Sequence, residues 1–145
     1  MTLVTTFDLK QAAFIKQEGT GEIKGEAFLR QNGGGVVTCA GREVTLVPST
    51  AYSDERFLFL FKNNEKGYSP VYRRVISVPN PEYASFTRKT RCDSQGKFKF
   101  TGLQSGNYYV AGDVIWVIGG LSQGGSLMQK VNVNFGQASE ALLTQ

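Results

Sequence analysis

Polar and apolar residues alternate along several short stretches of the chain, which is the pattern of half-buried strands. The clearest stretch is 97–100, where lysine and phenylalanine alternate, and a second one runs over 127–134. Regularly spaced short strands with turn residues between them are typical of a β-sandwich. We therefore expect an all-β chain. The expected strands lie at 21–30, 43–48, 97–100, 107–116 with a break at Gly112, 127–134 and 140–144.

Turn residues separate these strands. Asp93 and Gly96 predict a tight turn before 97–100, because Asp bonds nearby backbone and Gly accepts a positive φ. Asp93 lacks neighbouring oxygen ligands of the kind that Ca²⁺ needs, so a turn role is favoured over a calcium site. A second turn is expected at 102–106, with Leu103 directed back into the core. Glycine pairs at 119–120 and 124–125 predict a loop between them.

The stretch 48–87 is less regular. Ser53 could cap a helix whose first turn holds Asp54 and Glu55, acids that suit the positive end of a helix dipole. The run 57–61 has strand propensity, but the capping signal favours a helix, and we expect one there. A polar loop is expected over 63–69, and 71–78 is compatible with helix or strand. The predicted insertion is therefore a short helical segment around 53–76.

The residues from Asp93 to Val110 read D-x-x-G-x-F-x-F-x-G-L-x-x-G-x-Y-x-V. This pattern resembles the signature hairpin of carboxypeptidase regulatory-like domains, also called prealbumin-like or transthyretin-like domains. Segments 25–30 and 35–48 resemble the opening strands of such domains in bacterial envelope proteins, and the likeness extends over 21–143. It implies an antiparallel prealbumin-like (Ig-like) β-sandwich that more often holds, spaces or binds than catalyses.

The length of 145 residues suits one domain, which we expect at 21–145. Residues 1–20 form a leader whose role as an edge strand or a tether is left open. No apolar run approaches the roughly 20 residues of a membrane helix, and the first residues lack the features of a signal peptide. A native Met1 would indicate a cytoplasmic protein, whereas a mature fragment cloned without its export signal would look the same.

The two cysteines bear on the compartment. Cys39 and Cys92 both precede strands, at turns that could meet at one end of a sandwich. We expect a disulfide between them, which would indicate an oxidising compartment, and so a periplasmic or outer-membrane-associated protein after export, with any lipid anchor outside this chain. Two free thiols in a cytosolic protein are the alternative. Their spacing does not fit redox or zinc motifs, and we expect no metal or other cofactor.

The chain has no histidine, which removes Ser-His-Asp, Cys-His and histidine-metal chemistry. An enzyme that uses two carboxylates remains compatible with the sequence. We nevertheless expect no enzyme, because no motif supports one. The acids considered for such a role are Glu22, Glu26, Glu43, Asp54, Glu55, Asp93 and Asp113.

Positive charge is concentrated in the middle of the chain. Nine basic residues lie against three acidic ones over 62–99, and tyrosines are interleaved with them. Such a patch could bind an anionic glycan, a lipid headgroup or a nucleic-acid backbone, but a solvated strand face is the favoured explanation. Trp116 could stack on a sugar or lie in the core. No nucleic-acid motif occurs. The candidate binding residues are Arg73, Arg74, Arg88, Lys89, Arg91 and Trp116.

Together these features predict a non-catalytic accessory or binding module of the bacterial cell envelope, with an envelope protein or glycan as its partner. Two alternatives remain at this point. One is a structural subunit of an envelope complex, which an exposed apolar patch at 57–61 would favour. The other is a carboxylate-dependent enzyme that acts on envelope glycan. Neither the ligand nor the oligomeric state follows from the sequence.

Overall fold

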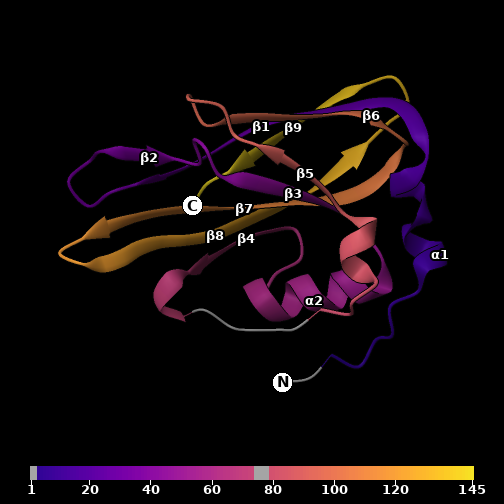
Figure 1. Cartoon of the computed structure of the whole chain (residues 1–145), viewed down its shortest axis with the longest axis horizontal. Helices are drawn as coiled ribbons and strands as arrows, with labels where there is room; N and C mark the ends of the chain where they lie inside the picture. Colours follow the sequence, from indigo (N-terminus) through magenta and orange to yellow (C-terminus); the bar gives the residue numbers. More distant parts are fainter. Residues whose placement is uncertain (1–2, 74–78) are drawn as a thin grey trace.

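Two β-sheets packed face to face form the protein, and a helix lies on the outside of the larger sheet (Figure 1). The computed structural model describes residues 3–73 and 79–145. One sheet has four strands, namely β2 (Val36–Thr38), β1 (Glu18–Arg30), β6 (Lys97–Leu103) and β9 (Ala138–Leu143). The other has five, in the order β4 (Lys66–Pro70), β8 (Leu121–Val133), β7 (Gly106–Ile118), β3 (Glu43–Pro48) and β5 (Arg88–Arg91). The predicted all-β sandwich is confirmed.

Among the described strands, all pairs are antiparallel except one. β9 runs parallel to β1, with Glu22 opposite Ala138 and Ala27 opposite Leu143. β1 therefore has β6 on one side and β9 on the other. The final strand was predicted at 140–144 in an antiparallel sandwich, so the prediction of a closing strand is confirmed but its direction differs.

The main core lies between the two sheets. Strand alternation sends every second residue inward, so β7 contributes Tyr108, Val110 and Val114, all fully buried. Phe98 and Phe100 face them from β6, as the lysine–phenylalanine alternation predicts. Leu103 is only 2% exposed, which confirms that it turns back into the core.

The turn before β6 forms as the sequence predicts. Asp93 Oδ1 accepts hydrogen bonds from the backbone N–H groups of Gln95 (2.8 Å) and Lys97 (3.0 Å). Gly96 has a φ of +77°, which favours glycine. The bond from Lys97 contributes most to lowering the pKa of Asp93, because these hydrogen bonds stabilise its charged form.

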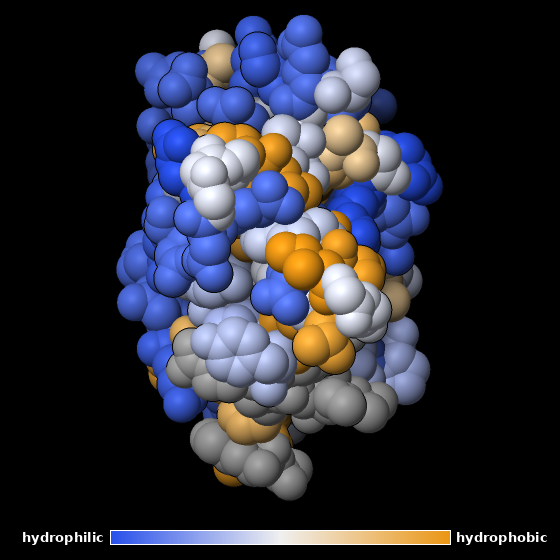
Figure 2. Space-filling model, turned by 90° about the vertical axis from the view of Figure 1, so that its left-hand side faces the viewer, coloured by the Kyte–Doolittle hydropathy of each residue, from blue (hydrophilic) through white to orange (hydrophobic). Residues whose placement is uncertain are grey.

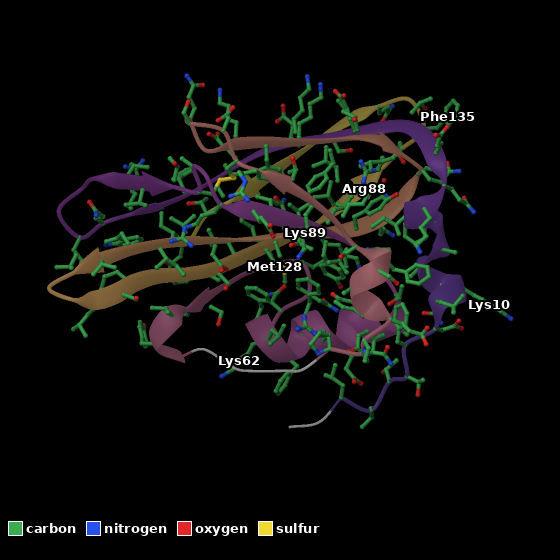
Figure 3. All side chains as sticks on the ribbon, viewed as in Figure 1. Lys10, Lys62, Arg88, Lys89, Met128 and Phe135 are labelled. Atoms are coloured by element: carbon green, nitrogen blue, oxygen red, sulfur yellow. A yellow bond between two sulfur atoms is a disulfide. The ribbon has the colours of Figure 1, made fainter. Side chains whose placement is uncertain are left out.

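A disulfide joins Cys39 and Cys92, whose Cα atoms are 5.9 Å apart (Figure 3). Cys39 follows β2 of the four-stranded sheet, and Cys92 follows β5 at the edge of the five-stranded sheet. The bond therefore confirms the expected disulfide, links the two sheets and closes a loop of 53 residues. Both cysteines are buried in the main core.

The predicted helix is present as α2 (Ala51–Phe61), but it begins earlier than expected. Thr50 is its N-cap, and Ser53 is the third residue of the first turn. The hydroxyl of Thr50 accepts from the Ser53 N–H (3.1 Å), while the Ser53 hydroxyl accepts from the Thr50 N–H (2.8 Å). This reciprocal capping box explains why Ser53 looked like the cap in the sequence.

The leader and the segment after α2 differ from expectation. The leader is neither strand nor plain tether, because it forms α1 (Leu9–Ala12) and the 3-10 turn η1 (Ala13–Lys16). The predicted loop at 63–69 is wrong, since β4 occupies 66–70 and pairs with β8. Two further 3-10 turns are η2 (Val71–Arg73) and η3 (Tyr83–Phe86), and 74–78 lie outside the described residues.

Two predictions for β7 and β8 are also wrong. β7 continues through Gly112 without a break, and the loop expected between the glycine pairs is mostly strand. Only Gly119 and Gly120, with φ of +59° and +81°, form the turn. Gly124 lies within β8, where a Cβ atom would sit 2.1 Å from the Val114 carbonyl oxygen. Glycine at this position lets β7 and β8 approach each other closely. In the sequence, a glycine needed for such an approach looks the same as a glycine in a loop.

Candidate functional site

The outer face of the five-stranded sheet carries a second, smaller core beneath α2. Val47, Tyr109 and Met128 point outward from β3, β7 and β8, and all are buried. Phe57 of α2 stacks on Tyr109 with ring centroids 4.2 Å apart and planes 9° from parallel. This aromatic contact holds α2 against the outer face of the sheet (Figure 1).

A carboxylate holds α2 to the sheet. Asp54 Oδ1 accepts hydrogen bonds from the Tyr109 hydroxyl (2.6 Å) and the Ser49 hydroxyl (2.7 Å). Lys130 of β8 places its Nζ 3.9 Å from the same oxygen. Burial raises the pKa of Tyr109, and the Asp54 charge raises it further. The helix is thus fixed by a polar contact as well as by packing.

A pocket of about 370 Å³ lies beside this contact, between α2 and strands β3, β7 and β8. We call it the α2 pocket. Val47, Phe57 and Ala111 give it an apolar floor, and half-buried Leu60 and Phe61 form one wall. An apolar cavity with a few polar groups directed into it is the usual form of a small-ligand site.

Two carboxylates line the α2 pocket from neighbouring strands. Val44 pairs with Gly112, so the next residues, Glu43 and Asp113, lie side by side on β3 and β7. Asp113 Oδ1 accepts a hydrogen bond from Ser126 (2.6 Å). Each carboxylate has about four acceptor positions, so Asp113 can also accept bonds from ligand hydroxyls.

Glu43 is paired with basic residues at the rim of the pocket. Its carboxylate oxygens lie 3.7 Å from Lys89 Nζ and 4.0 Å from Arg91 Nη2. These exposed pairs contribute little to stability, but they place positive charge next to the carboxylate. The rim can therefore both donate and accept hydrogen bonds.

Arg56 and Tyr83 complete the wall opposite the carboxylates. The Arg56 guanidinium lies 5.4 Å from the centre of the Tyr83 ring, and both residues line the pocket. Burial raises the pKa of Tyr83 to about 12, so its ring stays neutral at physiological pH. Edge contacts with Tyr52 and Phe7 fix the ring in place. The arrangement offers acceptors, a cationic donor and aromatic surface to one ligand.

The structure divides the basic residues predicted as a single patch. Lys89 and Arg91 pair with Glu43 at the rim of the α2 pocket and so lie on the outer face of β5, whereas strand alternation turns Arg88 to the other face. Figure 3 labels Arg88 and Lys89. Arg88 donates to the Thr101 carbonyl (3.0 Å) and lines a separate cavity. Arg73 ends η2, and neither its side chain nor Arg74 belongs to the described part of the structure.

Trp116 lies on the inner face of β7, half-buried against the main core. Its indole N–H is buried and has no acceptor among the described residues. This position matches the core interpretation of Trp116 and separates it from Lys89 and Arg91, which are on the outer face.

The remaining acids are scattered over the molecule. Glu55 fixes the leader, because it accepts from the N–H groups of Val4 (2.7 Å) and Thr5 (3.1 Å), which lower its pKa. Glu22 and Glu26 belong to β1 in the other sheet. Within residues 3–73 and 79–145, no group of three or more metal-binding side chains occurs.

The apolar run at 57–61 does not form an exposed patch. Phe57 is 3% exposed, and Leu58, at 51%, is the only exposed residue of the run. None of the described helices is long and apolar enough to cross a bilayer.

Sequence reasoning missed the residues that α2 brings to the pocket, chiefly Arg56 and Phe61, together with Tyr83 and Ser126. The capping signal at the start of α2 located the helix. The signal could not show which face of the helix is turned towards the sheet. That depends on the stacking of Phe57 on Tyr109, which belongs to a strand far away in the sequence.

No protein-family model matches the chain, and no curated protein matches it. A crystal structure from Pseudomonas aeruginosa, that of a "putative carbohydrate binding protein", is similar to it in fold, with a TM-score of 0.81. The two chains are 26% identical, and the match covers 97% of this chain and 99% of the other. The likeness therefore includes α2 and the strands that line the pocket.

Proposed function

We propose that this chain is a non-catalytic carbohydrate-binding module of the bacterial cell envelope and that the α2 pocket is its sugar site. The observation that carries the proposal is the convergence of Glu43, Asp113 and Arg56 on one apolar-floored pocket. Sugars present hydroxyls that bond to such charged groups and C–H faces that pack on apolar surface. The neighbour from P. aeruginosa, described as a "putative carbohydrate binding protein", supports the same ligand class.

The envelope assignment rests on the Cys39–Cys92 disulfide, because disulfides persist in oxidising compartments. The sequence resemblance to prealbumin-like domains of bacterial envelope proteins supports it further. In this proposal the protein acts outside the cytoplasm and holds a glycan of the envelope without cleaving it.

A glycan array that includes bacterial envelope oligosaccharides would identify a ligand, and calorimetry would then measure its affinity. We expect Asp113→Ala to weaken binding about 10-fold or more, since it removes a charged acceptor. Glu26→Ala is the matched control, because Glu26 lies on the four-stranded sheet beside a different cavity. Equal affinity of Asp113→Ala and Glu26→Ala would refute the assignment of the pocket.

The adjacency of Glu43 and Asp113 favours one second candidate, an enzyme that cleaves glycan with two carboxylates. Incubation of the bound glycan with wild-type protein, followed by mass spectrometry of the products, separates the two. The binding module leaves the glycan intact. Cleavage that is lost in Asp113→Ala would replace our proposal with the enzyme.

A further inference from the structure

The β7–β8 hairpin extends beyond the strands that flank it. β3 pairs with β7 only as far as Gly112, and β4 pairs with β8 only as far as Gly125. Among the described residues, 115–118 and 121–124 therefore pair only with each other. The hairpin ends in the two-glycine turn and projects from one end of the sandwich (Figure 1). We call residues 117–121 the hairpin tip.

The hairpin tip is apolar and exposed. Val117, Ile118 and Leu121 are 64%, 58% and 69% exposed. Single exposed apolar residues are common on proteins, but a contiguous group at a projecting turn indicates contact with something apolar. Tyr72, 81% exposed, belongs to η2, which packs beside β8. The face that carries this end of the molecule shows the apolar surface directly (Figure 2).

The charge around the hairpin tip is positive. The segments 30–42 and 114–125 contain no Asp or Glu, while Arg30 and Arg42 are exposed. Arg42 reaches the hairpin and donates to the Ile115 carbonyl (3.4 Å). The nearest acid along β7, Asp113, is five residues before Ile118, or about 16 Å along the strand. An apolar end with arginines and no acids is complementary to an anionic lipid surface.

We propose that the hairpin tip inserts into the surface of an anionic lipid bilayer. Val117, Ile118 and Leu121 enter the boundary between headgroups and acyl chains, and Arg30 and Arg42 contact lipid phosphates. The convex shape of the tip suits this occupant, because a bilayer needs no matching groove. The unpaired strand edges limit the depth, since backbone groups without partners are excluded from the hydrocarbon. This inference does not depend on the sugar site.

Sedimentation with vesicles tests the proposal. We expect wild-type protein to bind vesicles of phosphatidylglycerol mixed with phosphatidylcholine, and to bind pure phosphatidylcholine much more weakly. Leu121→Ser should lower the partition coefficient about 10-fold, because it removes one large buried apolar side chain. Leu58→Ser is the matched control, since Leu58 is an equally apolar residue exposed on α2. Arg42→Gln should weaken binding to the anionic vesicles only.

Fluorescence gives a second readout, because Trp116 is the only tryptophan and adjoins the hairpin tip. Bromine-labelled lipids should quench it in wild type and leave it unquenched in Leu121→Ser. Absence of wild-type binding to anionic vesicles would overturn the proposal, as would equal binding by Leu121→Ser and Leu58→Ser. A dimer that Leu121→Ser dissociates, without vesicle binding, would assign the tip to a second copy of the chain and overturn it as well.

Discussion

The two faces of the five-stranded sheet have different cores. The inner face is covered by another sheet and is filled largely by aliphatic residues, whereas the outer face is covered by α2 and is filled by aromatic rings with Asp54 at the edge. A helix about 10 Å across cannot cover a sheet of five strands, which is about 19 Å wide. The part that α2 leaves uncovered becomes the α2 pocket. The candidate site thus lies where the helix is too narrow to cover the whole sheet.

Two adjacent residues of β8 provide the strongest test of the difference between the inner and the outer core. Leu127 points to the inner face and Met128 to the outer face, and both are fully buried. We expect Leu127→Ala to lower the free energy of unfolding by about 4 kcal/mol and Met128→Ala by about 2 kcal/mol, because α2 can settle into the space more easily than a second sheet can. Urea denaturation measures both. Equal losses would indicate that the two cores are equally rigid.

Alkaline pH should destabilise the protein mainly through tyrosines on the outer face of the five-stranded sheet. Burial raises the pKa of Tyr83 to about 12 from its ordinary 10.0, so above pH 10 the unfolded chain loses this proton before the folded one does. Stability is unaffected below pH 10 and falls as pH rises towards 12, by about 2 kcal/mol for this tyrosine. Urea denaturation at pH 8 and pH 11.5 checks the sign.

Tyrosine-to-phenylalanine variants can show which face of the five-stranded sheet causes this loss of stability at alkaline pH. Burial also raises the pKa of Tyr109 on the outer face, and raises that of Tyr108 on the inner face to about 12. Replacing Tyr83 and Tyr109 together should remove more of the alkaline loss than Tyr108→Phe does. The reverse order would contradict the contrast between the faces.

The smallest expected effect concerns the attachment of α2. Asp54→Ala removes the acceptor of two hydrogen bonds, and we expect a loss of about 1.5 kcal/mol because Asp54 is partly exposed. Thermal unfolding measures the loss, with the exposed Glu140→Ala as the control. The same variant should weaken glycan binding at the α2 pocket and leave vesicle binding by the hairpin tip unchanged. Loss of both activities would show that the two surfaces are coupled.

Local chemistry explains which parts of this fold were predictable. The Asp93–Gly96 turn, the alternation of β6 and the α2 helix each depend on residues close together in the sequence, and each was predicted. One kind of error occurred where a single sequence signal has two physical causes. Gly124 looks like a loop residue, yet it is needed because Val114 approaches closely.

The candidate site was less predictable than the fold. The basic residues of β5 were identified as a patch, but strand alternation sends Arg88 and Lys89 to opposite faces. The α2 pocket combines Arg56 with Asp113, which are 57 positions apart in the sequence. Their meeting depends on the β3–β7 register and on aromatic stacking, and neither is encoded locally.

Because β1 pairs with β9, one edge of β1 stays without its partner until late in synthesis. β1 emerges from the ribosome more than 100 residues before β9, and until 138–143 are made its edge at 22–27 has no native partner. An exposed strand edge of this kind attracts other chains. β9 therefore also protects the edge of β1 from pairing with other chains, and this protection comes only after 138–143 have been made.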